Sequence, residues 1–231
     1  MNDASLVAKL KSERVHDQRD TEDGKGCQTP SLVSLPSFWS TDRDHPMTGG
    51  FIPKHGGYKK LLSYRKAEIV YDATVWFCEH FIDKRSRTHD QMIQAARSGK
   101  QNIIEGSMAS ATSKETEIKL TNVARASLEE LLADYRDFLR VRGLQEWHTG
   151  HAYTHRLREL NKIPEATYET FRKGIEHADP AIAANVIIGL IRVASYLLDR
   201  QLRRLEQAFV KEGGLRERMT RARLAERQNS G

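Results

Sequence analysis

A run of eight residues, HTGHAYTH, contains three histidines whose ring nitrogens are common zinc ligands. On a helix, His148, His151 and His155 would share one face. Thr149 and Gly150 disfavour a regular helix through the first pair, and no carboxylate stands at metal-ligand spacing in the same turn. We therefore predict no metal site and interpret the histidines as a solvated or capping cluster, with zinc binding as the open alternative.

Another group of side chains is suited to binding anions. At 100° per residue, five cations of segment 180–212 fall within about 120° of arc, opposite an apolar stripe. We call these residues the basic face: Arg192, Arg200, Arg203, Arg204 and Lys211. Such arrays contact phosphate groups without reading bases, so binding would be salt-dependent and weakly sequence-specific. The alternative is an ordinary solvated helix face.

Positive charge continues after Gly213 and Gly214 at four further candidate phosphate-binding residues: Arg216, Arg218, Arg221 and Arg223. Residues 190–231 carry ten Lys or Arg against five Asp or Glu, whereas residues 1–57 carry seven against eight. The net charge of +6 therefore arises from the folded part and its C-terminal end, which indicates a polyanionic partner.

Catalytic motifs are missing from the sequence: it has no Walker-type loop, nucleophile elbow, HExxH or paired cysteines. Glu129, Glu130 and Asp134 are neighbouring acids, but Arg125 and Arg136 lie within one or two turns. Surface ion pairs explain these acids more simply than acid–base catalysis does. We predict a protein that is not an enzyme and needs no cofactor.

The N-terminal part of the chain lacks a structural period. Residues 1–57 hold four of the six prolines, and we predict a disordered N-terminal tail in which Phe38 and Trp39 are candidate docking residues. Cys27 and Cys78 are expected to be free thiols. No run approaches the ~20 apolar residues of a membrane span, and no signal peptide is recognisable, so we expect a cytoplasmic protein that does not enter a membrane.

Helical periodicity begins at Tyr58. The apolar face of a first helix is predicted to carry Leu62, Ile69, Ala73, Trp76 and Phe77. The polar run 83–88 ends this helix.

Local sequence patterns mark the ends of two further helices. The capping-box pattern of Thr88 and Gln91 predicts the start of the second helix, and Glu105-Gly106 its end. Thr112 with Glu115 repeats the start signal for a third helix, which runs to Gly143 over about 30 residues.

Asp179 followed by Pro180 predicts the cap and first residue of a fourth long helix, ending at Gly213-Gly214. Before it lies an insert, residues 144–178, where Pro164 is predicted to open a short helix. No segment alternates with the period of a strand. The chain is predicted to be all-α: an up-down four-helix bundle over 58–214, with this helical insert and a basic helical tail over 215–231.

Small residues recur on the buried side of the second helix: Ala95, Ala96 and Gly99. A glycine inside a helix costs ~1 kcal/mol relative to alanine, and Asn102 near this face needs a hydrogen-bond partner. We predict close packing of another helix here. Its role is either subunit assembly or the core of one chain.

The order of these motifs resembles the four-helix-bundle family of the ribosomal-RNA intervening-sequence proteins, which also contains the accessory variability protein of diversity-generating retroelements. The matching residues are Asp90-Gln91, Ala95-Ala96, Asn102-Ile103, Glu105-Gly106, Ser113-Lys114-Glu115 and Ala124-x-x-Ser127-Leu128-x-Glu130. The resemblance covers about residues 58–145 and, more loosely, 180–212. It implies a small bundle that forms a ring of five subunits, without catalysis. In the retroelement branch it also implies a basic surface that binds nucleic acid and a reverse transcriptase.

The N-terminal tail, the insert and the arginine-rich C-terminal helix depart from that compact pattern, so the chain resembles an extended relative with different partners. We predict a bacterial homopentamer that binds nucleic acid, either structured RNA or an RNA–protein complex, with a nucleic-acid-processing protein as a further possible partner. One alternative is a protein-interaction scaffold without nucleic-acid contact. Another is a metal-dependent enzyme that uses the histidines of the insert.

Overall fold

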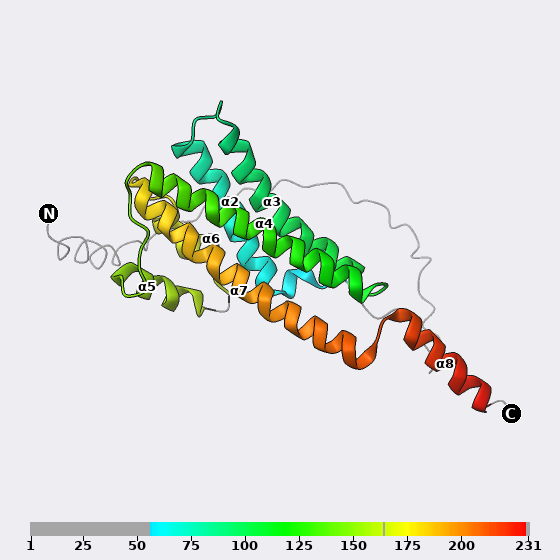
Figure 1. Ribbon diagram of the computed structural model, residues 1–231. Coiled ribbons are helices and arrows are strands. Elements are labelled where there is room, and N and C mark those ends of the chain that lie inside the picture. Colours follow the sequence, from blue (N-terminus) through cyan, green and yellow to red (C-terminus); the bar gives the residue numbers. More distant parts are fainter. Residues whose placement is uncertain (1–55, 164, 230–231) are drawn as a thin grey trace, which may run out of the picture. The chain divides into compact units, whose positions relative to one another are not determined.

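The computed structural model describes residues 56–163 and 165–229, and all regular structure in these ranges is helical (Figure 1). In chain order the elements are the 3₁₀ helix η1 (Tyr58–Lys60) and the helices α2 (Leu62–Phe81), α3 (Arg87–Ala109), α4 (Lys114–Val141), α5 (Ala152–Asn161), α6 (Tyr168–Ile175), α7 (Pro180–Glu212) and α8 (Leu215–Asn229). The predicted all-α class is confirmed for this part of the chain. The expected N-terminal tail, with Cys27, Phe38 and Trp39, lies outside the described residues except for Gly56 and Gly57.

The four long helices pack around one core. Helix α2 contacts α3, α3 contacts α4, α4 contacts α7, and α7 contacts α2. Figure 1 shows α3 and α4 running side by side. Leu62, predicted on the apolar face of α2, is instead 49% exposed. At 100° per residue around the helix axis, the centre of the buried face of α2 lies about 90° from Leu62.

Aromatic side chains fill one part of this core. The ring of Phe77 lies 4.9 Å from the rings of both Tyr135 and Phe138, measured between centroids. The buried Tyr135 hydroxyl donates to Oγ1 of Thr74 at 3.2 Å, and burial raises the pKa of Tyr135. Cys78 is also buried, as a free thiol, and burial raises its pKa to about 12.

Helix α3 begins earlier and ends later than predicted. Its N-cap is Ser86, whose side chain accepts a hydrogen bond from the Thr88 backbone N–H at 3.2 Å. Thr88 is therefore a residue of the first turn and not the cap. The helix also continues past Gly106 to Ala109, since Gly106 is buried against α4 and keeps right-handed geometry.

Helix α4 is capped by Ser113 and not by Thr112. The Ser113 hydroxyl accepts from the Thr116 backbone N–H at 3.1 Å, while Thr112 donates to the Ala109 carbonyl at the end of α3. Two hydroxyl residues in succession thus divide the two helix ends between them. After Val141 the chain turns at Gly143, which has φ of +65°.

The insert contains α5 and α6, which both contact α7, while α6 also contacts α2. Pro164, predicted to open a short helix, lies outside the described residues. The second of these helices, α6, begins at Tyr168, after a capping box formed by Thr167 and Thr170. Asn185 of α7 holds the start of the insert, accepting from the Trp147 backbone N–H at 2.7 Å and donating to the Gln145 carbonyl at 2.9 Å.

Helix α7 has the predicted boundaries. The Asp179 side chain accepts from the Ala181 backbone N–H at 2.8 Å, Pro180 is the first residue, and Gly213 ends the helix with φ of +71°. The helical run Pro180–Asn229 contains an 18-residue window of mean hydropathy 1.9, long and apolar enough to cross a membrane. That window is 61% buried within the structure, as expected when α7 supplies one wall of the core.

Candidate nucleic-acid interface

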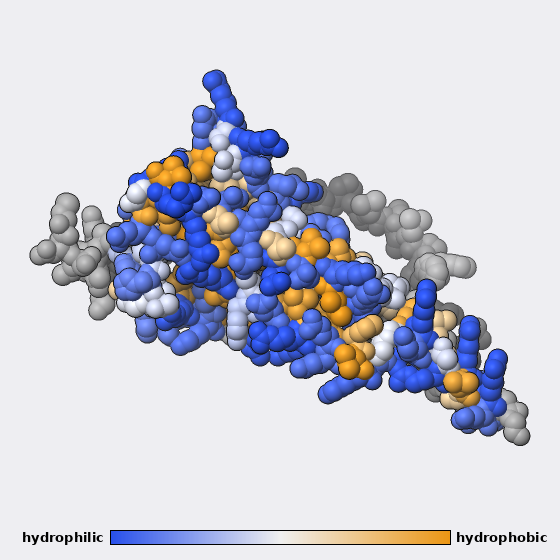
Figure 2. All heavy atoms as spheres, viewed as in Figure 1, coloured by the Kyte–Doolittle hydropathy of each residue, from blue (hydrophilic) through white to orange (hydrophobic). Residues whose placement is uncertain are grey.

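The basic face and the core-forming stripe occupy opposite sides of α7. The apolar side buries Ile187, Leu190, Ile191, Ala194 and Leu198. The five residues of the basic face are all exposed. Hydrophilic side chains cover much of the surface in Figure 2, with separate hydrophobic patches between them.

The insert covers only the N-terminal part of α7. Gly189 allows this contact, since a Cβ at that position would overlap the Leu157 side chain of α5. Gly174 of α6 similarly lies against Val186. In Figure 1 the C-terminal part of α7 extends beyond α5 and α6. Most of the basic face therefore lies on a stretch of helix that α5 and α6 do not cover.

Arg192 differs from the rest of the basic face because its charge is compensated. Its guanidinium pairs with Glu146 of the insert, and Arg136 of α4 binds the other oxygen of the same carboxylate at 3.2 Å. Two cations thus share one anion. Arg192 serves a structural contact between α7, the insert and α4, and it is a weaker candidate for phosphate than the sequence indicated.

Arg200, Arg203 and Arg204, which we call the unpaired arginines, have no carboxylate within ion-pair distance among the described residues. Asp199, the neighbour of Arg200 in sequence, is engaged instead by Arg125 of α4 at 3.5 Å. Three exposed guanidinium groups therefore stand on adjacent turns without local neutralisation. Such groups attract phosphate, because a bound phosphate replaces counterions instead of an existing ion pair.

Of the remaining predicted phosphate-binding residues, some are freely exposed and others are held by contacts or partly buried. Lys211, Arg216 and Arg223 are exposed. Arg221 donates to the Glu212 carbonyl at the end of α7, where a cation is favourable to the helix dipole. Arg218 is half-buried, with its Nε enclosed and without a partner in the described residues.

Sequence reasoning missed two residues near the basic face. Tyr196 lies one turn before Arg200 and is 56% exposed, and the Arg200 guanidinium lies over its ring at 5.9 Å from the centroid. The four-residue spacing Arg192, Tyr196, Arg200 was the available signal. Glu146 was not detectable, since it lies 46 residues from Arg192 in the chain.

The small residues of α3 are buried within one chain, and Gly99 contacts α4. Gly99 is buried against Leu128 and Ala124, and Ala95 and Ala96 are buried in the same core. A Cβ on Gly99 would lie 2.7 Å from Cδ2 of Leu128. Gly99 thus permits close helix packing within one subunit.

The side-chain amide of Asn102 makes its hydrogen bonds within its own helix. Its Nδ2 donates to the Ser98 carbonyl at 2.9 Å and to Ser98 Oγ at 3.2 Å. Ser98 Oγ in turn lies 2.9 Å from Ser127 Oγ of α4. The asparagine therefore reaches α4 through a serine pair and not directly.

The three histidines do not share a helix face, because α5 begins after the first two. Nδ1 of His148 accepts from the Gly150 backbone N–H at 3.1 Å, and Nδ1 of His151 accepts from the Tyr153 N–H at 3.4 Å as the N-cap of α5. His151 also stacks on Trp147, whereas His155 is exposed. Within residues 56–163 and 165–229, no group of three His, Cys, Asp or Glu side chains is placed to hold a metal.

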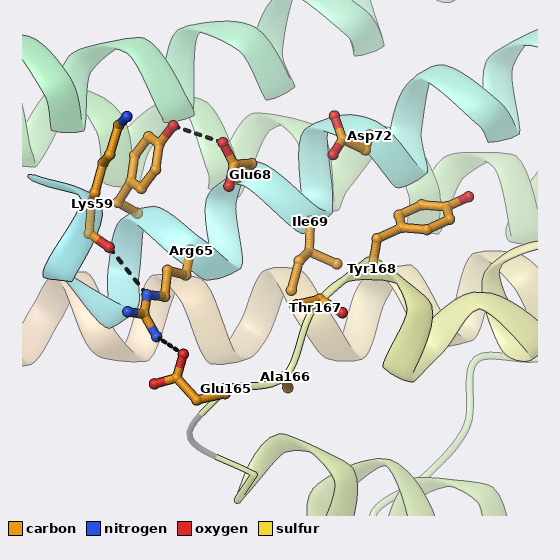
Figure 3. A pocket seen from close by; sticks show the side chains of 10 residues that line it. Lys59, Arg65, Glu68, Ile69, Asp72, Glu165, Ala166, Thr167 and Tyr168 are labelled. Carbon is orange, nitrogen blue, oxygen red and sulfur yellow. Dashed lines mark hydrogen bonds and ion pairs between the residues drawn. The ribbon is translucent and has the colours of Figure 1, made fainter. Parts of the chain in front are cut away.

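A groove of about 520 Å³ lies between α2 and residues 165–168 (Figure 3). Its polar groups largely bind one another: Tyr64 donates to Glu68 at 2.7 Å, and Arg65 binds Glu165 at 2.8 Å. Burial, followed by the hydrogen bond to Glu68, raises the pKa of Tyr64 to about 12. The Arg65–Glu165 pair attaches the insert to α2.

The acidic residues of α4 do not form the predicted ion pairs. Arg125 and Arg136 bind Asp199 and Glu146 instead of Glu129, Glu130 or Asp134. Burial, followed by the nearby carboxylates Glu130 and Asp137, raises the pKa of Asp134.

No protein-family model matches the chain, and no curated protein or solved structure is significantly similar to it. The resemblance to the intervening-sequence family therefore rests on the motif residues alone.

Proposed function

We propose that this protein is a non-enzymatic helical-bundle protein that self-assembles and binds nucleic acid, with structured RNA or an RNA–protein complex as its target. The unpaired arginines of α7 are the primary contact with phosphate groups. Lys211, Arg216 and Arg223 extend the same charge toward the C-terminus. Arg192 contributes less, because Glu146 neutralises it.

The observation that carries this proposal is the difference in pairing along α7. Arg192 has a carboxylate partner, whereas Arg200, Arg203 and Arg204 have none among the described residues. An exposed pair of opposite charges is worth at most about 1 kcal/mol, so an exposed arginine without a partner costs the fold little. A cluster of three arginines without a carboxylate partner concentrates positive potential on this part of α7.

We also propose that α2, α3, α4 and α7 form an up-down four-helix bundle. The cyclic pattern of contacts among these helices supports that arrangement, as do the short connections 82–86 and 110–113. Assembly into five subunits rests on the family resemblance. Light scattering of the full chain tests it, and a monomer at micromolar concentration would contradict it.

The function is tested by fluorescence anisotropy with a labelled structured RNA. The wild-type chain is compared with the triple variant Arg200→Gln, Arg203→Gln and Arg204→Gln, which should bind at least tenfold more weakly. The matched control replaces Arg85, Arg87 and Arg97, three exposed arginines of the α2–α3 turn and α3, with the same loss of charge. Equal weakening by both triple variants would show general electrostatic attraction only. No binding by the wild-type chain would favour the scaffold alternative.

A further inference from the structure

Tyr196 is an exposed aromatic residue within the basic face. At 100° per residue it projects between Arg192 and Arg200, on the side of α7 opposite the core. It is 56% exposed and makes no hydrogen bond to a described residue. Its ring is therefore available to a ligand.

The neighbouring arginine leaves much of this ring open. The Arg200 guanidinium lies 5.9 Å from the ring centroid, near the outer limit of a cation–π contact. An aromatic ring beside cations is the combination that binds single-stranded nucleic acid, since the ring stacks a base while the cations hold the backbone.

The spacing along the helix fits a short single strand. Arg200, Arg203 and Arg204 follow Tyr196 by four, seven and eight residues, which is roughly 6 to 12 Å at 1.5 Å per residue. Each nucleotide of a stacked strand advances about 3.4 Å along the strand axis, so this distance corresponds to about two to four stacked nucleotides. A base stacked on Tyr196 would thus bring its neighbouring phosphates to the unpaired arginines.

We infer that Tyr196 stacks an unpaired base, so the basic face selects RNA segments with unpaired bases over duplex RNA. This inference rests on the proposed function and names the part of an RNA that the surface recognises. Bases inside a duplex are stacked on one another and present only their edges, so they cannot cover the tyrosine ring. Loops and bulges of a structured RNA are the matching ligands.

The test measures the affinity of the full chain for an unstructured RNA strand and for the same strand in a perfect duplex. Tyr196→Leu, which removes the aromatic ring but keeps an apolar side chain, should weaken binding to the single strand by about 5- to 150-fold, the equivalent of about 1–3 kcal/mol for one stacked base. Binding to the duplex should hardly change. Tyr196→Phe keeps the ring and should bind both probes as the wild type does.

Salt dependence separates this role from that of the arginines. Because Tyr196 is uncharged, Tyr196→Leu should leave the slope of log affinity against log salt unchanged. Two results for Tyr196→Leu would overturn the stacking role while leaving the proposed function in place. The variant could bind the single strand as tightly as the wild type does, or it could bind both probes more weakly by the same factor. Failure of the wild-type chain to bind either probe would overturn both. Thermal unfolding of each variant confirms that it is folded.

Discussion

Gly99 of α3 lies directly against Leu128 of α4, where an added Cβ would be 2.7 Å from Cδ2 of the leucine. Both residues are buried, so the leucine has little space to move. The close approach of these helices therefore depends on the absence of a side chain at residue 99.

Gly99→Ala should destabilise the protein by up to about 2 kcal/mol, because overpacking costs about 1–3 kcal/mol and alanine gains ~1 kcal/mol over glycine in a helix. Gly106→Ala in the same helix is the control. Its Cβ would meet its nearest neighbour at 3.4 Å, an ordinary contact, so this variant should be neutral or slightly stabilised. Chemical denaturation measures both. A double-mutant cycle with Leu128→Ala should show coupling, and strict additivity would contradict the direct contact.

The cap of α3 gives a second prediction. Ser86→Ala should destabilise the protein by about 1 kcal/mol, because it removes the acceptor for the Thr88 backbone N–H. Thr88→Ala should have a smaller effect, since the Thr88 side chain is exposed and does not cap the helix. Urea unfolding of the two variants gives the comparison. A larger loss for Thr88→Ala would restore the capping box predicted from sequence.

Lys66 gives a prediction about pH. Lys66 is buried, and its Nζ lies 4.7 Å from the Phe171 ring centroid without a hydrogen bond to a described residue. Burial lowers the pKa of Lys66 to about 8 from an unfolded value of 10.5. The unfolded state therefore binds more protons between these values, and this residue destabilises the fold most below pH 8. Lys66→Met should raise the Tm at pH 7.

The Tm advantage of Lys66→Met should shrink as pH rises from about 8 toward 10.5, because the wild-type amine is then neutral in both states. Comparing the two proteins at each pH cancels the contributions of every other titrating group, because both proteins contain the same ones. A Tm difference that is the same at pH 7 and pH 10 would show that the ammonium is not desolvated in the fold.

Glu146→Gln should strengthen RNA binding several-fold. The substitution releases Arg192 and Arg136 from their shared carboxylate and adds one positive charge at the N-terminal end of the basic face. Anisotropy titration measures the effect. Glu165→Gln, which releases Arg65 at the groove beside α2, makes the same charge change elsewhere and should have little effect. Equal strengthening by both variants would mean that only net charge matters.

Local chemistry explains which parts of the fold were predictable. Asp179 and Pro180 determine the start of α7 through one cap hydrogen bond and one fixed dihedral angle, so its boundaries followed from a few adjacent residues. The starts of α3 and α4 were misassigned because hydroxyl residues cluster there: Ser86 caps α3 instead of Thr88, and Ser113 caps α4 instead of Thr112.

The candidate site was less predictable because its charges depend on distant partners. Helical spacing alone placed Arg200, Arg203 and Arg204 on one exposed face. The pairing of Arg192 with Glu146 brings together residues 46 positions apart, and no local pattern encodes it. The position of Asn102 was visible in the sequence, but its link through Ser98 to Ser127 required the packing of α3 on α4.

The salt dependence of RNA binding tests the central claim most directly. Affinity is measured over a series of salt concentrations for the wild-type chain and for the variant with Arg200, Arg203 and Arg204 replaced by glutamine. If all three contact phosphates, the slope of log affinity against log salt should flatten by about 2 to 3, at 0.7–0.9 per lost contact, whichever RNA sequence is used. A triple variant that keeps both the affinity and the slope of the wild-type chain would contradict the assignment of phosphate binding to α7.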